Sequence, residues 1–167
     1  MAHSEKTFRT FEDLELYRVA REFRKAMYAL NRRLPNFEKF ELGSQIRRAA
    51  VSLTNNIAEG HGRYHYLDQI RFTLQARGSL EELIDDLNVC DDEGYLPSAE
   101  VTDLKQQSWR VYQLLNGYVR YLRDRKAELS AALHESAPPP GLTEDDLDAL
   151  STDVPGSTVQ RFNGSTI

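Results

Sequence analysis

Cysteine and long apolar runs are scarce in this chain. One cysteine, Cys90, occurs among 167 residues, so no disulfide can form within the chain. No apolar run approaches the roughly 20 residues that a membrane-spanning helix needs. The first ten residues are polar and lack the apolar segment of a secretory signal. These absences argue against disulfide-stapled and membrane-spanning proteins, and they predict a reducing, cytoplasmic setting.

Basic residues are nearly missing from the C-terminal part. From Ala131 onward a single base, Arg161, accompanies six acids, which leaves 20 of each sign before it because the whole chain has 21 bases and 26 acids. The net charge of -5 therefore belongs to the tail, and a neutral body can still carry a basic patch. Composition predicts a flexible arm over 1–10 and a disordered tail over 134–167, Pro-rich and then acidic. Three leucines in that tail allow one short helical turn, either folded back or offered to a partner: Leu142, Leu147 and Leu150.

Four segments carry apolar residues at helical spacing, and no strand pattern competes with them. They span about 11–34, 41–59, 66–92 and 99–133. Together they predict an all-α protein whose residues 11–133 form an antiparallel up-and-down four-helix bundle. The expected core stripes are Leu16, Ala20, Phe23, Met27, Leu30 and Leu34; Leu42, Ile46, Ala49 or Ala50, Leu53 and Ile57; Ile70, Leu74, Leu80 or Leu83, Leu87 and Cys90; and Val101, Leu104, Val111, Leu115, Tyr118, Leu122 and Leu129.

Capping and turn residues mark the ends of these segments. Thr10 with Asp13 predicts a capping pair before the first helix, and Pro35 is expected to end that helix. Gly60 and Gly62 are expected to end the second helix. Gly78 lies inside the third helix, which predicts the close approach of another helix there. The stretch from Glu93 to Ser98 predicts the end of the third helix, then a turn, and then a serine that caps the start of the fourth helix.

No set of residues points to catalysis or to a cofactor. His61 and His65 have i,i+4 spacing, but Gly62 between them breaks the helix that a shared metal would need. Acidic neighbours are expected to raise the pKa of Cys90, which predicts a core or rim thiol rather than a nucleophile. There is no Walker glycine loop, no Gly-x-Ser-x-Gly elbow and no arginine four to six residues before a histidine. We therefore expect no enzyme, no metal and no cofactor.

The third segment is strongly acidic: nine acids and no Lys or Arg lie between Glu81 and Asp103. The acids of 81–86 repeat at i,i+4 and are expected to form a solvated face, or a face that docks against basic helices. An acid/base or metal site is the weaker alternative.

The stretch 42–63 combines core residues with many polar ones. In the structural interpretation Asn56 bonds across helices, Glu59 pairs with Arg63, and Arg47 and Arg48 pair with acids of the third helix. In the functional interpretation the arginines bind phosphates while Asn or Gln side chains contact bases. Spacing alone favours structure. The polar residues concerned are Ser44, Gln45, Arg47, Arg48, Ser52, Thr54, Asn55 and Asn56.

A family resemblance begins in this stretch. The run Gln45–Ser52, continued by Asn56-Ile-Ala-Glu59-Gly60-x-Gly62-Arg63, resembles the hallmark of bacterial four-helix bundle proteins, the 23S rRNA intervening-sequence proteins. Phe11-x-Asp-Leu, Gly78-Ser-Leu-x-Glu-Leu and Gly94-Tyr-Leu match as well, so the likeness covers about 8–125. It departs at Thr54-Asn55, where the family's usual Pro-Ser would kink the helix, and the acidic tail lies outside it.

The resemblance implies a bundle similar to members that assemble as homopentamers. It also implies kinship with accessory proteins of diversity-generating retroelements, which bind a reverse transcriptase and nucleic acid. Two functions are expected: an oligomeric scaffold that binds RNA, DNA or a nucleoprotein partner, or a pure protein-interaction module that pairs the acidic third helix with a neighbour's basic helices. The candidate binding residues are Arg18, Arg21, Arg24, Arg47, Arg48, Arg63, Arg120 and Arg123. The candidate structural residues are Gln45, Asn56, Glu59, Gly60, Gly62 and Gly78.

Overall fold

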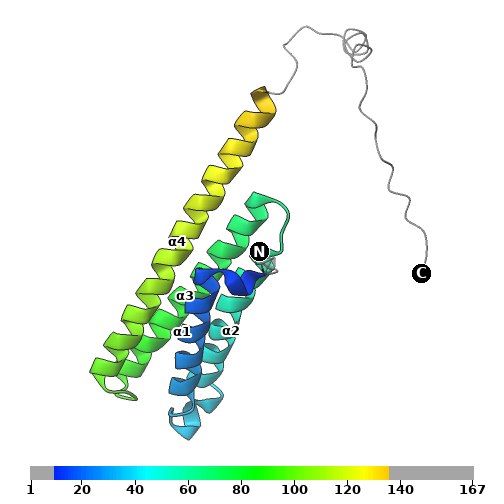
Figure 1. Cartoon of the computed structure of the whole chain (residues 1–167). Helices are drawn as coiled ribbons and strands as arrows, with labels where there is room; N and C mark the ends of the chain where they lie inside the picture. The colour runs from blue at the N-terminus through cyan, green and yellow to red at the C-terminus, as the bar shows by residue number, and fades with distance from the viewer. Residues whose placement is uncertain (1–9, 136–167) are drawn as a thin grey trace, which may run out of the picture. The chain divides into compact units, whose positions relative to one another are not determined.

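Four helices dominate the part of the chain that the computed structural model describes, residues 10–135. No strand occurs in that range, and the all-α prediction is confirmed (Figure 1). The arm over 1–9 and the tail from 136 onward, including the leucines of 142–150, lie outside the described residues. The elements are the 3-10 helices η1 (Phe11–Asp13) and η2 (Asn36–Lys39), and the α-helices α1 (Glu15–Asn31), α2 (Leu42–His61), α3 (Tyr66–Asp92) and α4 (Ser98–Glu135).

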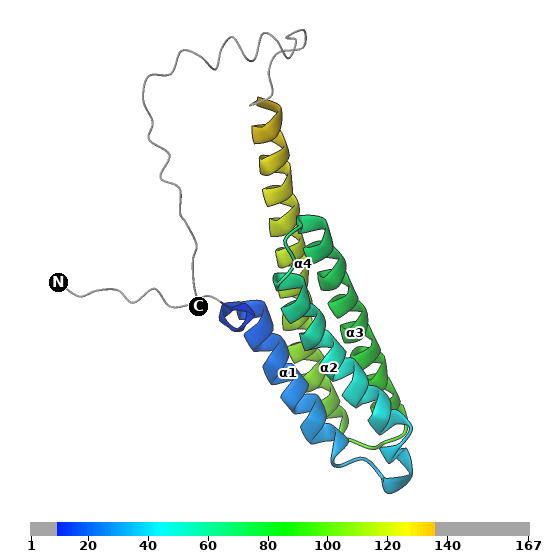
Figure 2. The same cartoon turned by 90° about the vertical axis from the view of Figure 1, so that its right-hand side faces the viewer.

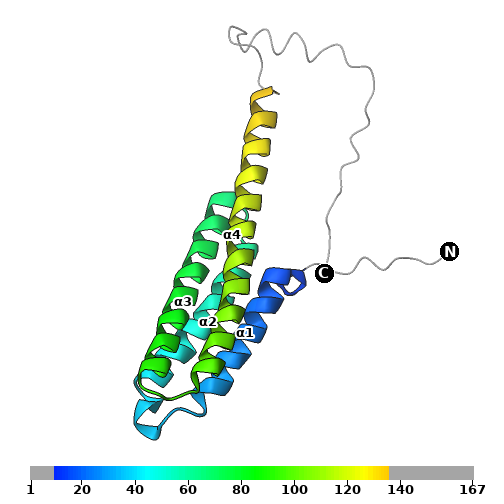
Figure 3. The same cartoon turned by 90° about the vertical axis from the view of Figure 1, so that its left-hand side faces the viewer.

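Side-chain links between the helices show that neighbours run antiparallel. Between α3 and α4, Lys105 Nζ donates to Asn88 Oδ1 at 2.7 Å, and Arg77 Nη1 donates to Asn116 Oδ1 at 3.3 Å. Later residues of α3 thus meet earlier residues of α4. Figures 2 and 3 show the same alternation along the chain, with short connections at alternate ends of the bundle. The predicted up-and-down bundle is confirmed.

The core consists of the apolar stripes that the sequence predicts. Phe23, Met27, Leu53 and Leu83 are fully buried, and both alternatives at 49/50 and at 80/83 prove to be buried. The largest difference is Leu129, which is 52% exposed. Every residue of α4 from 123 to 132 is exposed, so helical spacing continues in the sequence beyond the last packed turn.

The helix ends follow local chemistry more closely than the apolar pattern does. Thr10 Oγ1 accepts from Glu12 N at 3.2 Å while Thr10 N donates to Asp13 Oδ2 at 3.0 Å, so the predicted capping pair forms. It caps η1, however, and α1 starts only at Glu15 and ends at Asn31, before Pro35. Gly94 has a φ of 66° in the turn before α4, a conformation that glycine adopts without strain.

The close helix approach that the sequence predicts at Gly78 occurs at Gly60 instead. Gly78 is exposed, and a Cβ placed there would meet no described atom within 4 Å. The predicted close approach at Gly78 is therefore wrong, because this glycine lies on the outer side of α3. Close approach occurs at Gly60 instead, where a Cβ would lie 2.9 Å from Phe72 Cβ. Gly60 lets the end of α2 touch the start of α3.

Among residues 10–135, no helix is both long enough and apolar enough to cross a membrane.

Candidate functional site

A hollow surface, here called the basic groove, lies between α1 and α2. Three adjoining hollows of about 540, 560 and 420 Å³ make it up. They adjoin one another through shared lining residues: Tyr28 and Val51 line two of them, and Arg32 and Arg47 connect these to the third. Among the described lining residues there is no Asp or Glu. The cationic lining residues are Arg24, Lys25, Arg32, Lys39, Arg47 and Arg48.

The helical repeat of α1 places its cations along one side of the groove. Arg21, Arg24, Lys25, Tyr28 and Arg32 follow one another at steps of one, three or four residues, which keeps them on one helix face. The opposite face of the same helix carries the buried stripe of Phe23, Met27 and Leu30. The amphipathic pattern of α1 therefore builds the core and the basic groove together.

Hydrogen bonds hold two of the groove's arginines in place. Arg24 Nη1 donates to Thr54 Oγ1 at 2.7 Å, from α1 to the buried hydroxyl of α2. Arg47 Nη2 donates to the Lys39 carbonyl at 3.2 Å. The Asn31 amide satisfies both of its neighbours in one orientation, in which its Oδ1 accepts from Arg47 Nη1 at 2.9 Å. Arg24 and Arg47 are thus preorganised, with part of each side chain engaged by the fold.

Arg48 is exposed and only lightly held. Its Nη1 donates to Ser44 Oγ at 3.1 Å, one helical turn earlier. Arg32 and Asn55 are also exposed along the groove, and Tyr28 is partly buried in its wall. Guanidinium groups suit phosphate oxygens, and an aromatic ring can stack on a base. The groove can therefore bind an anionic chain.

The other predicted binding arginines do not line this groove. Arg63 pairs with Glu59, as the sequence predicts, and its guanidinium carbon lies 4.7 Å from the centre of the Phe72 ring. Arg120 and Arg123 are exposed on α4. The structure therefore brings Arg24, Arg47 and Arg48 together, keeps Arg21 on the same face of α1, and leaves the rest on other surfaces.

Three contacts proposed for α2 turn out differently. Asn56 Nδ2 donates to the Ser52 carbonyl at 2.9 Å, within its own helix. The bond across helices is made by Ser79 Oγ, which donates to Ser52 Oγ at 2.8 Å. Neither Arg47 nor Arg48 forms an ion pair with an acid of α3 among the described residues, because Arg47 turns toward Asn31 and Lys39, and Arg48 toward Ser44.

The other residues considered for chemistry, His61, His65 and Cys90, do not line the basic groove. His61 is the last residue of α2 and His65 precedes α3, so the two histidines do not share a helix face. Burial, with Asp86 and Glu38 nearby, raises the pKa of the Cys90 thiol to about 11. The prediction of a core or rim thiol with a raised pKa is confirmed, and burial is its main cause.

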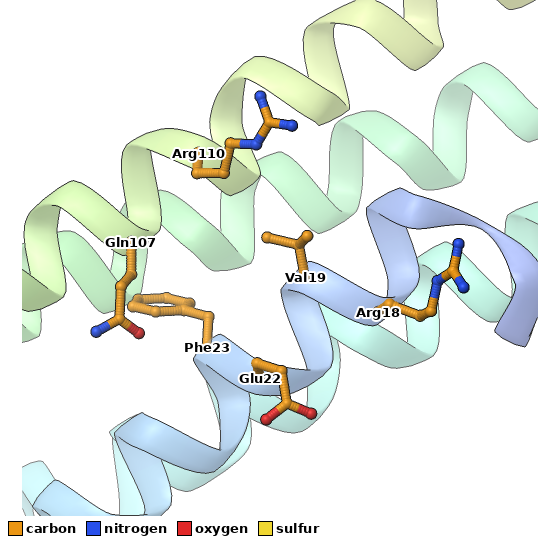
Figure 4. A pocket seen from close by; sticks show the side chains of 6 residues that line it. All are labelled: Arg18, Val19, Glu22, Phe23, Gln107 and Arg110. Carbon is orange, nitrogen blue, oxygen red and sulfur yellow. The ribbon is translucent and has the colours of Figure 1, made fainter.

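A smaller apolar pocket of about 310 Å³ lies between α1 and α4 (Figure 4). Val19 and Phe23 are directed from α1 toward α4, while Arg18 and Glu22 point away. Arg110 Nη2 at its rim donates to Glu15 Oε1 at 2.7 Å. This pocket places Arg18 apart from the basic groove.

The sequence points to Arg21, Arg24, Arg47 and Arg48 as binding residues, but not to the groove that α1 and α2 form together. Lys25, Tyr28 and Arg32 line the groove, and their shared face with Arg24 was visible in the helical spacing. Lys39 comes from η2, and only the turn of the chain between the helices brings it to the groove.

Comparison with known proteins agrees with this architecture. A family model described as 23S rRNA-intervening sequence protein matches residues 12–117. The match takes in α1, α2, α3 and the first half of α4, and so contains the whole basic groove. No curated protein matches the chain. Because the family match covers well over half of its residues, this chain belongs to the 23S rRNA-intervening sequence protein family.

Proposed function

We propose that this chain is a non-enzymatic scaffold that binds RNA or DNA, alone or within a nucleoprotein partner, through the basic groove. The observation that carries the proposal is a set of adjoining hollows between α1 and α2 with six cationic side chains, of which Lys25 is paired with Glu22 outside the lining, and no carboxylate among its described lining residues. In the family setting, we further propose that the chain acts as a homo-oligomer, a pentamer by analogy with the assemblies that the resemblance implies. A role as an accessory protein of a retroelement reverse transcriptase is one form of this function.

Single-stranded nucleic acid suits the dimensions of the groove. From residue 24 to residue 32, α1 rises about 12 Å, enough for a few nucleotides. Arg24 and Arg47 are fixed by the fold, while Arg32 and Arg48 are exposed and can adjust to a bound chain. Non-specific affinity then comes mainly from phosphates, so it must fall steeply as salt rises.

The test is fluorescence anisotropy with a labelled single-stranded RNA and the same sequence as DNA, over a range of salt concentrations. The triple variant Arg24→Glu, Arg32→Glu, Arg48→Glu is expected to weaken binding by more than about 100-fold at low salt. Milder replacement of the same three residues by Gln is expected to reduce the log–log salt slope by about 2, because each phosphate that is no longer neutralised accounts for about 0.7.

A matched control separates the groove from overall charge. Arg71, Arg120 and Arg123 are exposed on α3 and α4, and changing all three to Glu alters the net charge by the same amount. This control is expected to lose less than about a tenth as much affinity. Undetectable binding at low salt, or equal losses in both triples, would contradict the proposal.

The second candidate is a protein-interaction module, favoured by the exposed acids Glu81, Glu82 and Asp85 of α3. In an oligomer these acids would face the basic residues of a neighbour's α1 and α2, Arg48 among them. Arg48→Glu would then dissociate the assembly in light scattering without any nucleic acid present. An unchanged mass would count against this candidate.

A further inference from the structure

A polar cavity lies between α2 and α3, next to the basic groove. It has a volume of about 340 Å³ and is lined by Gln45 and Arg48 of α2 and by Glu82 and Asp86 of α3. We call it the acidic cavity. Arg48 lines both surfaces, but the two carboxylates belong to the cavity alone.

Asp86 is the unusual member of this set. Its side chain is only 7% exposed, and its Oδ2 atom is buried without a hydrogen-bond partner among the described residues. A buried polar atom without a partner costs free energy. Burial, with Asp85 and Glu82 close by, raises the pKa of Asp86 to about 6. At neutral pH the carboxylate is therefore mostly charged, and nothing on its own helix neutralises it.

Arg48 lines the cavity, but its hydrogen bond goes to Ser44 and it forms no ion pair with a described acid. No ion pair joins a described residue to Glu81, Glu82, Asp85 or Asp86. The cavity thus has two carboxylates and one guanidinium in its lining, with further acids outside it. Its surplus of negative charge favours a cationic occupant and disfavours a phosphate chain.

We propose that the acidic cavity binds the guanidinium group of an arginine side chain supplied by a partner protein. Glu82 and Asp86 are four residues apart on α3, so their Cβ atoms lie about 5–6 Å from each other. A planar guanidinium with five N–H donors can bridge two such carboxylates, whereas an ammonium acts as a compact point charge. The Gln45 side chain adds a neutral acceptor to the lining.

Metal binding is the less suitable use of the same residues. The described residues contain no group of three or more His, Cys, Asp or Glu that could hold a metal ion. Two carboxylates beside an arginine make a poor cage for a divalent cation, which prefers six or more oxygen ligands. Asp86 reaches the cavity with the small exposed part of its carboxylate, and a guanidinium can supply the hydrogen-bond donors that this under-satisfied carboxylate needs.

The test titrates the full chain with L-argininamide and follows the side-chain carboxyl resonance of Asp86 by NMR. Binding is expected to be saturable and to lower the pKa of Asp86 from about 6 to below about 5. L-Lysinamide is expected to bind at least about fivefold more weakly. Asp86→Asn is expected to reduce argininamide affinity about tenfold, while Asp85→Asn, an exposed neighbour with the same change in charge, stays within about twofold.

Two sources of the arginine are separated by light scattering. If a second copy supplies it, Asp86→Asn lowers the mass of the assembly and argininamide competes with assembly. If another protein supplies it, argininamide binds and the mass stays constant. Because Glu82 and Asp86 are not changed in the nucleic-acid test, loss of one activity in these variants leaves the other measurable. Should Asp86→Asn fail to fold, Glu82→Gln on the exposed side of the cavity serves instead.

Two results would overturn the proposal. The first is an Asp86 resonance that argininamide does not move, together with an unchanged mass in Asp86→Asn. The second is an Asp86 pKa already at or below about 4 in the free chain that rises in Arg48→Gln, because Arg48 itself would then occupy the cavity.

Discussion

Two neighbouring surfaces that both include residues of α2 differ in the sign of their charge. Toward α1, the basic groove gathers six cations and no described carboxylate. Toward α3, the acidic cavity holds Glu82 and the buried Asp86. Arg48 stands between them and lines both. A body with equal numbers of acids and bases is thus divided into surfaces of opposite sign, a few residues apart.

This difference shows why average charge says little about binding. Charges of opposite sign would cancel if they paired across the helices, yet the arginines of α2 turn to hydroxyl, amide and carbonyl oxygens instead. The surface keeps its positive potential on one side and its negative potential on the other. Such a molecule is suited to bind an anionic chain and a cationic protein segment at separate sites.

Both sides depend on the buried stripe of α2, so the largest effect is expected there. Leu53 is fully buried, and Leu53→Ala is expected to lower the free energy of unfolding by about 3 kcal/mol. Leu129→Ala, at an exposed leucine of α4, is expected to change it by less than about 0.5 kcal/mol. Urea denaturation followed by circular dichroism measures both. Similar losses in the two variants would mean that α4 is packed beyond Leu122.

The acidic side should show its own dependence on pH. The pKa of Asp86 is about 6 in the folded chain and about 3.9 when unfolded. The folded state therefore holds more protons between these values, so stability falls as pH rises from about 4 to 6 and stays reduced above that. Asp86→Asn removes this cost and is expected to be about 2 kcal/mol more stable than the wild type at pH 8, with no gain near pH 4.

Other titratable groups around Asp86 affect the comparison of unfolding free energies at pH 4 and pH 8, which urea denaturation measures. Glu82 and Asp85 on α3 help to raise the pKa of Asp86, and Arg48 lines the cavity from α2. The Cys90 thiol, with its pKa of about 11, stays neutral throughout this range. Asp85→Asn provides the matched control: it removes an exposed charge that helps to raise the pKa of Asp86, so it is expected to gain less than half as much as Asp86→Asn at pH 8 and nothing near pH 4. A gain that is equal at pH 4 and pH 8 would exclude the titration of Asp86 as its cause.

The smallest effects concern the spacing of α2 and α3. Gly60→Ala is expected to lower the free energy of unfolding by about 1 kcal/mol. The new Cβ would lie 2.9 Å from Phe72 Cβ, and the higher helix propensity of alanine offsets only part of that steric cost. Gly78→Ala has open space around it and is expected to add up to about 1 kcal/mol of stability. Thermal unfolding of both variants compares them directly. The opposite order would reinstate the close approach that the sequence predicts at Gly78.

Much of the fold was visible in the sequence because helical spacing reports burial directly. The stripe from Leu16 to Leu30 and the bounds of α3 at Tyr66 and Asp92 follow from that spacing and from turn residues. The pairing of Glu59 with Arg63 was equally local. The predictions for Leu129 and Gly78 were wrong. Apolar spacing continues to Leu129 beyond the last packed turn of α4, and Gly78 lies on the outer side of α3.

The candidate site was less accessible to such reasoning. The sequence by itself determined which residues share a face of α1 and where the helices stop, because those properties depend on neighbours within one turn. Only the tertiary structure decided that Arg24 meets Thr54, that Arg48 separates a basic groove from an acidic cavity, and that Asp86 is buried. These outcomes depend on how each helix is rotated against the next, and that rotation is set by the packing of whole side chains across the bundle.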